Sequence, residues 1–448
     1  MKGSIAIVFL LLYSCRVGDT AHHYSNKNNG PIIGTSKIEA KPKEGYGDTN
    51  KNNVNRESTK LEDTKFSITI GDPYTLYRAQ TPQKWGFVQF PRLFRTIEGD
   101  LTAVWNMNPD DTRAKTRTLW SRSKDEGETW DFKSGQRPIN PGTKLSNGEY
   151  LKFTTRYIKE NTLNLPKPTH KDEKRNTGAE FNFYRRSELK EEYNVFHINR
   201  IGDNKKVEPY TALRRDTISF AHSQRGMFSF QAWGDLIETS SNDLIKVIYP
   251  DFISKNGRIQ PSGISFYRSE NKEFTKWSRL SAIPFEFNDL KQYGIKPRNV
   301  QGFSEPAFLR VSGDTLLSVF RSDNGREAPL FQSISVDSGS NWSMPEAITS
   351  FGVLPQLLKL NNGITVCSYG RPGVEIIFNE SVSKSTWSSP VSLVPKDGTY
   401  SKSSCGYTGL IAINDNSFII VYANFKSEIS GVKRKAIEVR KITVNIRK

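Results

Sequence analysis

The sequence contains few of the residues from which metal, nucleotide and disulfide sites are built. Its 448 residues include three cysteines and five histidines. The histidines are scattered, no Cys/His cluster has the spacing of a zinc site, and no glycine-rich nucleotide motif is present. We therefore predict no metal and no cofactor. Only Cys367 and Cys405 lie beyond the N-terminal region, so no disulfide framework is expected; a single bond between them and two unrelated buried thiols both fit the sequence.

Long apolar runs are also missing, apart from one near the N-terminus. The run Ile5–Tyr13 follows Lys2 and is too short to cross a bilayer, which is the pattern of a signal peptide. It ends in Leu12–Cys15, which resembles the lipobox of bacterial lipoproteins. Residues 1–14 are therefore predicted to be removed and Cys15 to be lipidated, which would anchor the protein to a bacterial outer membrane. The alternative is an ordinary secreted protein that loses Cys15 with its signal peptide.

The segment that follows, residues 15–64, has few large apolar side chains. It is rich in Asn, Lys, Gly, Thr and Glu, a composition that buries too little apolar surface to fold. We predict a disordered polar linker here. Residues 65–448 are predicted to form one domain, because no second linker-like segment interrupts them.

One short pattern occurs six times between residue 91 and the C-terminus. In each copy an apolar strand runs into a Gly, Asp or Asn turn and out into a second apolar strand. Alternating apolar residues fit half-buried antiparallel strands, and these turn residues tolerate the positive φ of tight hairpins. The turns are centred near Gly99, Gly148, Asp243, Gly313, Gly363 and Asp415.

The spacing of these hairpins predicts an all-β fold. Three intervals between successive turns are about 50 residues, close to the roughly 40 to 50 residues of one four-stranded propeller blade. No helical periodicity lies between the hairpins, and we predict a six-bladed β-propeller. The two longer intervals hold extra sequence, and a seven-bladed ring would fit if they conceal a blade. The polar stretch Lys167–Glu192 in one interval is expected to be an insertion loop, and the other contains Phe252–Arg298.

Two hairpins lead into a Ser-x-Asp-x-Gly-x-x-Trp box. The boxes are Ser123–Trp130 and Ser335–Trp342, and degraded versions end at Trp277 and Trp387. Such an Asp can hydrogen-bond the turn backbone, the Gly allows unusual dihedral angles, and the Trp buries a large apolar area. We expect the boxes to stabilise blade turns rather than to contact a ligand.

The net charge of +17 indicates an anionic partner. A strongly basic protein attracts polyanions through its long-range field. Export and the lack of any nucleic-acid motif favour an acidic glycan or polysaccharide over nucleic acid, although part of the charge is expected to be solvated surface. We expect the protein to be a monomer.

The hairpins, the boxes and the residues near them resemble the sialidase (neuraminidase) superfamily of six-bladed propeller glycoside hydrolases, over roughly Thr81 to Phe425. The resemblance implies an exo-acting hydrolase that releases a terminal acidic sugar. In that family three arginines clamp the substrate carboxylate, a tyrosine paired with a glutamate is the nucleophile, and an aspartate is the acid/base. Guanidinium groups bind carboxylates bidentately, and a neutral tyrosine attacks an anionic sugar with less repulsion than a carboxylate would.

Four residues in the last three hairpin copies match that pattern in order. The segment SEPAFLRVSGDTLLSVFRS has Glu305 at the position of the tyrosine-activating glutamate and Arg321 at the second arginine. Arg371 stands at the third arginine, and Tyr407 stands at the nucleophile. The resemblance implies these roles for the four residues.

The first copy departs from the family, because Gln89 stands where the first arginine is expected. A glutamine can hydrogen-bond a substrate but carries no charge, so the clamp has two cations instead of three. This departure weakens the case for sialic acid itself. It fits a ligand whose acidic group sits elsewhere, or a neutral sugar unit.

The acid/base of the family lies in the loop between the first hairpin and the first box, where this chain has Asp110 and Asp111. Either could protonate a leaving oxygen, and both could be solvated turn residues. Trp85, Trp105 and Trp233 are candidates for stacking on a sugar, with core packing as the alternative role of each.

Two other functions fit the same sequence. One is a propeller polysaccharide lyase acting on uronate-containing glycans, with His222 and Tyr407 as the candidate proton-transfer residues. The other is a non-catalytic glycan-binding lipoprotein, in which Gln89 marks a site that has lost its activity.

Overall fold

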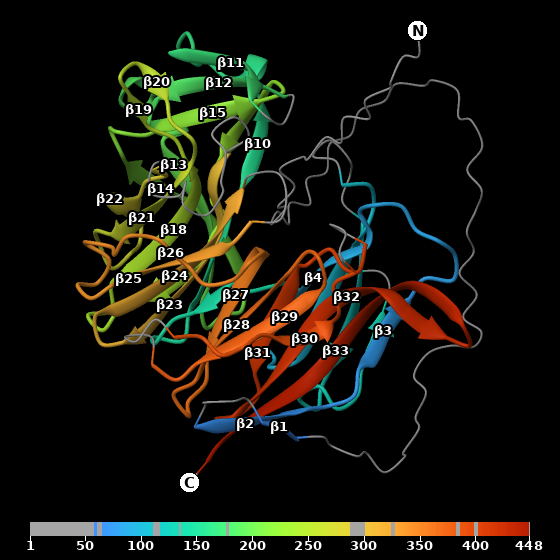
Figure 1. The fold of residues 1–448 in the computed structure, drawn as a ribbon. Helices are drawn as coiled ribbons and strands as arrows, with labels where there is room; N and C mark the ends of the chain where they lie inside the picture. Colours follow the sequence, from blue (N-terminus) through green and yellow to red (C-terminus); the bar gives the residue numbers. More distant parts are fainter. Residues whose placement is uncertain are drawn as a thin grey trace, which may run out of the picture.

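The protein is built of β-strands that form a ring of blades (Figure 1). The computed structural model describes residues 58–60, 65–110, 117–133, 136–175, 179–286, 301–323, 328–381, 386–397 and 402–447. The predicted signal peptide and Cys15 lie outside these residues, as does most of the predicted linker. Within them the only helical segments are three 3-10 turns, and no helix is long and apolar enough to cross a bilayer. These turns are Glu160–Thr162, Arg186–Glu188 and Glu191–Tyr193.

Six blades make up the described ring, which confirms the six-bladed prediction, and the described residues of the two long intervals form no seventh blade. Five of the blades consist of four antiparallel strands. Their strands are, in chain order, β4 (Phe87–Arg95), β5 (Leu101–Met107), β6 (Thr118–Ser123) and β7 (Asp131–Lys133); β8 (Thr143–Lys144), β9 (Tyr150–Thr154), β13 (Val195–Ile201) and β14 (Val207–Arg215); β17 (Leu236–Glu238), β18 (Leu244–Asp251), β21 (Gly263–Ser269) and β22 (Lys276–Ile283); β23 (Gly302–Ser312), β24 (Thr315–Asp323), β25 (Leu330–Ser335) and β26 (Glu346–Ala347); and β27 (Val353–Lys359), β28 (Thr365–Gly370), β29 (Val374–Asn379) and β30 (Val391–Val394).

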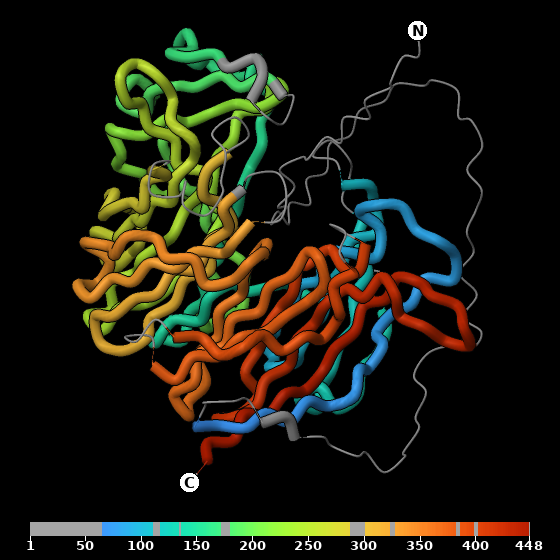
Figure 2. Tube along the Cα trace, viewed as in Figure 1, coloured from blue at the N-terminus to red at the C-terminus, as the bar shows by residue number. Residues whose placement is uncertain are grey.

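The sixth blade joins the two ends of the chain and closes the ring. The C-terminal strands β31 (Thr408–Ala412), β32 (Ser417–Ile429) and β33 (Val432–Ile446) form its body. Two N-terminal strands, β2 (Phe66–Ile70) and β3 (Tyr74–Arg78), pair with β33, so the blue and red segments run together in Figure 2. A further strand, β1 (Ser58–Lys60), pairs with β2. The end of the stretch predicted as a linker therefore belongs to the sheet, since edge pairing uses main-chain groups and needs no apolar side chains.

The second and third blades are fused into one eight-stranded sheet. Their outer strands β14 and β22 pair in parallel, with Leu213 opposite Lys276. Buried charges cross this seam. Asp216 lies 3.5 Å from Arg214 and 3.3 Å from Arg279, and Arg279 also pairs with Asp251 at 2.6 Å.

A separate five-stranded sheet is inserted into these two blades. It contains β10 (Arg156–Lys159), β11 (His170–Arg175), β12 (Ala179–Arg185), β15 (Phe220–Gln224) and β16 (Met227–Phe230), and it stands above the ring in Figure 1. The polar stretch Lys167–Glu192 was expected to be a loop, and that expectation was wrong. Phe181 and Phe183 alternate along β12 and pack against Phe252, which gives this charged segment an apolar face. A short hairpin, β19 (Ser254–Lys255) and β20 (Arg258–Ile259), follows Phe252 in the chain.

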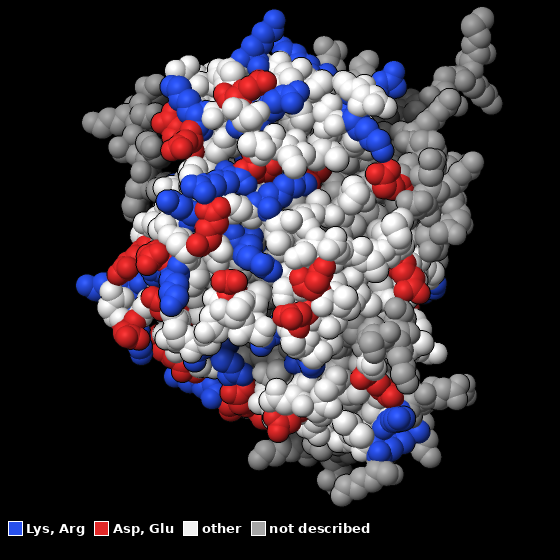
Figure 3. Space-filling model, turned by 90° about the vertical axis from the view of Figure 1, so that its left-hand side faces the viewer, with Lys and Arg blue, Asp and Glu red and all other residues white. Residues whose placement is uncertain are grey.

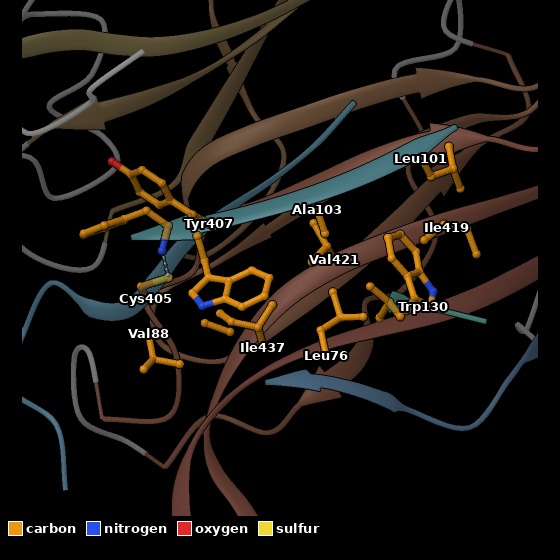
Figure 4. Close-up of a cluster of buried hydrophobic side chains, with 14 of the residues drawn as sticks. Leu76, Val88, Leu101, Ala103, Trp130, Cys405, Tyr407, Ile419, Val421 and Ile437 are labelled. Carbon is orange, nitrogen blue, oxygen red and sulfur yellow. Dashed lines mark hydrogen bonds between the residues drawn. The ribbon is translucent and has the colours of Figure 1, made fainter. Parts of the chain in front are cut away.

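The hydrophobic core lies between neighbouring blades, where the apolar faces of successive sheets meet. One cluster joins the first and last blades and includes Trp105, Val421 and Ile437. Figure 4 shows Tyr407 and Cys405 at one end of this cluster, and Trp130 at the other. Cys367 and Cys405 are both buried and both free, so the possible bond between them is absent.

Strand direction divides the ring into two ends. In each blade the first strand begins, and the second strand ends, at the same end of the ring, because the strands alternate in direction. Glu305 near the start of β23, Arg321 near the end of β24 and Tyr407 just before β31 therefore gather at one end. The six turns recognised in the sequence lie at the opposite end. The inserted sheet is built from the β9–β13 and β14–β17 connections, which leave the blades at the Glu305 end.

The boxes hold the turns at the end remote from Glu305. Ser123 Oγ donates to Asp125 Oδ1 at 2.8 Å, the Gly127 N–H donates to Ser123 Oγ at 2.8 Å, and the Thr129 N–H donates to Asp125 Oδ1 at 2.9 Å. Trp130 Nε1 donates to the Gly127 carbonyl at 3.1 Å. The second box repeats the Ser and Asp contacts, but Trp342 Nε1 donates to Ser281 Oγ of the preceding blade at 3.1 Å. In the degraded box before Trp277, Asn271 takes the place of the Asp. The Ser and Asp side chains of both boxes bond within their own turns, which is the role predicted for them.

Candidate active site

Tyr407 and Glu305 meet at the centre of the candidate site, although they come from different blades. Tyr407 Oη donates a hydrogen bond of 2.7 Å to Glu305 Oε1. Both side chains are buried, with Tyr407 7% and Glu305 6% exposed. The glutamate is therefore placed to accept a proton from this hydroxyl, as the nucleophile pair requires.

Two further groups, Arg321 and the Leu354 N–H, bond to the Glu305 carboxylate. Arg321 Nη1 donates to both of its oxygens at 3.3 Å, and the Leu354 N–H donates to Oε2 at 2.7 Å. Burial alone raises the pKa of Glu305, but Arg321, Arg371 and the hydrogen bonds outweigh it and hold the pKa below its ordinary value. Glu305 is therefore ionised at neutral pH and able to act as a base.

The backbone at Glu305 is distorted to present this side chain. Glu305 has φ +51°, and the pairing of β23 with β24 shifts register between Ser304 and Ala307. Positive φ is uncommon for residues other than glycine and is associated with functional sites. The bulge turns Glu305 toward the end of the ring where Tyr407 lies.

Arg371 follows β28 directly and is also buried. Its Nε donates to the Cys405 carbonyl at 2.9 Å, and its guanidinium carbon lies 5.3 Å from the ring centroid of Tyr407. Gly406 makes this approach possible, because a Cβ there would lie 2.5 Å from the Arg371 nitrogen. The structure thus brings Glu305, Arg321, Arg371 and Tyr407 together.

Gln89 is placed differently from its predicted role as a substrate-binding residue. Its side chain is fully buried, its Oε1 accepts the Gly86 N–H at 3.0 Å, and its Nε2 has no partner among the described residues. Val88 and Phe90 on either side both have positive φ, and two register shifts flank Gln89 in the β4–β5 pairing. These irregularities turn the Gln89 side chain into the interior, where it bonds to the main chain of the loop before β4.

The ring of Phe90 packs against Tyr407 instead, with centroids 4.9 Å apart. The Phe90 N–H lies 3.4 Å from Cys405 Sγ. Sequence reasoning did not find Phe90 or the Leu354 N–H, because neither has a local sequence signal and each meets its partner only where two blades pack together.

Asp110 lies in the connection after β5, and its carboxylate accepts a hydrogen bond from Trp85 Nε1 at 2.9 Å. The guanidinium of Arg371 lies over the Trp85 ring at 5.3 Å, which links Asp110 to the other candidates. Asp111, the second acid/base candidate, lies outside the described residues. Of the three candidate stacking tryptophans, Trp105 and Trp233 are buried in the core and Trp85 is 37% exposed.

His222 does not join this group. It lies on β15 in the inserted sheet, with its ring between Phe181 at 5.8 Å and Phe252 at 5.4 Å. Tyr407 lies before β31, among Glu305, Phe90 and Arg371. The structure therefore does not bring together the pair that a lyase reaction was expected to use. Among the described residues there is also no group of three or more His, Cys, Asp or Glu side chains that could hold a metal ion.

We compared the chain with protein-family models, curated proteins and solved structures, and only the solved structures gave matches. No protein-family model and no curated protein matches the sequence. Among solved structures, a protein of unknown function from Dyadobacter fermentans is similar over 84% of this chain and 99% of that chain, with a TM-score of 0.54 and 14% identity. This likeness concerns the fold alone, which the strand order shows to be a six-bladed propeller.

Two more distant matches to this propeller are enzymes. A mutant NanB sialidase from Streptococcus pneumoniae is 12% identical, with a TM-score of 0.43 over 84% of this chain and 70% of that chain. An α-L-arabinanase from Penicillium chrysogenum is 15% identical, with a TM-score of 0.42 over 83% of this chain and 98% of that chain. The low identities make this chain a divergent propeller.

Proposed function

We propose that the protein is an exo-acting glycoside hydrolase of sialidase type, which releases terminal acidic sugars from extracellular glycans. The observation that carries the proposal is the 2.7 Å hydrogen bond from Tyr407 to the buried, ionised Glu305. A buried tyrosine and glutamate in this arrangement form an activated nucleophile. Arg321 and Arg371 beside them supply positive charge for an acidic substrate.

The first step of the proposed reaction forms a covalent intermediate. Tyr407 Oη attacks the anomeric carbon while its proton passes to Glu305. The bond to the leaving oxygen breaks, and the acid/base donates a proton to that oxygen. We propose Asp110 for this role; Asp111 remains a candidate that lies outside the described residues.

The second step releases the sugar. Asp110 removes a proton from a water molecule, which attacks the anomeric carbon, and the bond to Tyr407 breaks. Glu305 returns its proton to the Tyr407 oxygen. Two displacements at one carbon retain its configuration, so the product should have the anomeric configuration of the substrate.

The burial of Gln89 supports a substrate that needs fewer than three cations. Only Arg321 and Arg371 carry charge at the clamp positions, and Glu305 already bonds to Arg321. We propose an acidic sugar related to sialic acid, with its carboxylate toward Arg371. An unsubstituted sialic acid should bind more weakly here than at a site with three arginines.

The experiment is a panel of glycans with two readouts, reducing ends and ultraviolet absorbance. The panel includes 3′-sialyllactose, 4-methylumbelliferyl sialic acid, an arabinan and a polyuronate. On the three glycans without the methylumbelliferyl group, a new reducing end without new absorbance supports a hydrolase, and an unsaturated product would support the lyase. Release of methylumbelliferone from the fourth substrate also supports a hydrolase. If the protein binds a glycan but forms no product, the result would support a non-catalytic glycan-binding protein and refute the proposed hydrolase.

Surface charge and export form a second part of the proposal. On the face drawn in Figure 3, Lys and Arg side chains are interspersed with Asp and Glu rather than gathered into one patch. This supports attraction of anionic glycans by the overall charge of +17 rather than by one basic groove on that face.

We propose that a lipid attached to Cys15 anchors the protein to the membrane. Labelling with a fatty-acid analogue should mark the wild type and not Cys15→Ser; equal labelling of both would refute it.

A further inference from the structure

Trp85 connects the candidate acid/base to the candidate anion clamp. It lies in the loop before β4 and makes two polar contacts through different parts of its ring. Its Nε1 donates to Asp110 Oδ2 at 2.9 Å, and its face carries the guanidinium of Arg371 at 5.3 Å. One side chain thus contacts a carboxylate and a cation that come from the first and fifth blades.

Aromatic neighbours fix the orientation of the Trp85 ring. Phe90 and Phe425 both pack edge-to-face on it, with centroids 6.0 Å and 6.3 Å away. Such pairs have a preferred geometry and restrain the rotation of a partly exposed ring. Phe90 also packs against Tyr407, so the same aromatic group borders the nucleophile. The direction of the indole N–H is therefore set by the first and last blades.

Asp110 needs such a restraint. It follows β5 in the connection to β6, so no strand pairing fixes the direction of its side chain. A general acid must be held within hydrogen-bonding reach of the leaving oxygen, and small displacements cost much of its effect. The rigid indole supplies a donor at a defined place, and the cation over its face makes that ring part of the arginine clamp.

We propose that Trp85 is a positioning residue that holds Asp110 in place relative to Arg371 and Tyr407. The inference rests on the proposed function, because it assigns Asp110 the role of acid/base. Trp85 need not contact the substrate for this. The Trp85 ring contacts both Arg371, which is proposed to bind the substrate carboxylate, and Asp110, which is proposed to protonate the leaving oxygen. Substrate binding and the placement of Asp110 are therefore coupled through this ring.

Kinetics on two substrates test the proposal. Trp85→Phe keeps an aromatic face for Arg371 but removes the donor to Asp110. A good leaving group needs little protonation, so turnover of 4-methylumbelliferyl sialic acid should fall only a few-fold, whereas turnover of 3′-sialyllactose should fall on the order of 10-fold or more. Trp130→Phe makes the same change at the opposite end of the ring and should leave the ratio of the two rates unchanged. An equal loss on both substrates in Trp85→Phe would overturn the proposal.

A second measurement needs no activity. The indole ¹⁵N–¹H resonance of Trp85 is assigned by its disappearance in Trp85→Phe, and it should shift in Asp110→Ala because its acceptor is gone. An unchanged resonance would refute the link between the two residues. If the wild type cleaves no glycan while this resonance shifts, the proposed function fails and the link between Trp85 and Asp110 stands.

Discussion

Gly406 lies so close to Arg371 that a Cβ at Gly406 would be 2.5 Å from the Arg371 backbone nitrogen. Its φ of +77° is also one that side chains rarely adopt. The glycine therefore permits the chain before Tyr407 to pass directly against Arg371. Two members of the candidate site depend on this one close approach.

Gly406→Ala should destabilise the protein and displace both residues. We expect a loss of about 2–4 kcal/mol in the free energy of unfolding, because backbone strain adds to a clash with main-chain atoms. Gly148→Ala is the matched control, since Gly148 has φ +90° with no atom within 4 Å of the added Cβ. Urea denaturation should show a clearly smaller loss for the control; equal losses would mean that the contact with Arg371 is unimportant.

Glu305→Gln should remove the base that accepts the Tyr407 proton. Turnover of any hydrolysed glycan should fall by roughly 10²-fold or more, which is the usual contribution of general-base catalysis. The amide is nearly isosteric, so circular dichroism should show an unchanged fold. Activity close to that of the wild type would exclude Glu305 from the mechanism.

The same substitution tests the lowered pKa of Glu305. A carboxyl group whose pKa is lower in the folded than in the unfolded state stabilises the fold above its unfolded pKa, and this contribution is lost as the pH falls through the folded pKa. The stability difference between wild type and Glu305→Gln should therefore be constant near neutral pH and shrink below about pH 4. Urea denaturation across the pH range measures this stability difference. A difference that grows on acidification would contradict a lowered pKa of Glu305.

Gln89→Arg should fail to restore a three-arginine clamp. The position is fully buried, so the new cation would be desolvated without a counter-ion, at a cost of about 3–5 kcal/mol in stability. Gln136→Arg, at an exposed position, controls for the added charge. Tighter binding of sialic acid by a stable Gln89→Arg protein would show that the site opens more than the structure indicates.

Asp216→Asn should weaken the seam between the second and third blades. The change leaves Arg214 and Arg279 facing a neutral group in a buried cluster, and we expect a loss of about 3–5 kcal/mol. Asp131→Asn removes an exposed carboxylate 3.8 Å from Lys133 and should cost less than about 1 kcal/mol. Similar denaturation midpoints for the two variants would contradict a structural role for the cluster.

Much of the fold was readable from the sequence because each hairpin carries its own turn chemistry. The alternating apolar residues around Gly313 and Gly363 predict paired strands without reference to the rest of the chain. The order Glu305, Arg321, Arg371 and Tyr407 then follows from which strand of which hairpin each residue ends or begins. The resemblance to sialidases implied the roles of these four residues, and in the folded propeller they lie close together at one end of the ring.

The errors arose where distant contacts decide the local structure. Charged residues around Lys167–Glu192 obscured the alternation of Phe181 and Phe183, whose apolar partners Phe220 and Phe252 lie far away in the sequence. Gln89 is predicted to bind substrate because it stands at the position of the family's first arginine, whereas the structure buries its side chain. The positive φ values of Val88 and Phe90 depend on packing against the last blade, which no local pattern reveals.

The central claim is that Tyr407 is the nucleophile, and a covalent trapping experiment tests it most directly. A fluorinated sialyl fluoride forms the glycosyl-enzyme intermediate and slows its hydrolysis, so the sugar stays on the protein. Peptide mass spectrometry should locate the added sugar on Tyr407 in the wild type and find no adduct in Tyr407→Phe. An adduct on another residue, or a Tyr407→Phe protein that hydrolyses glycans at the wild-type rate, would contradict the mechanism.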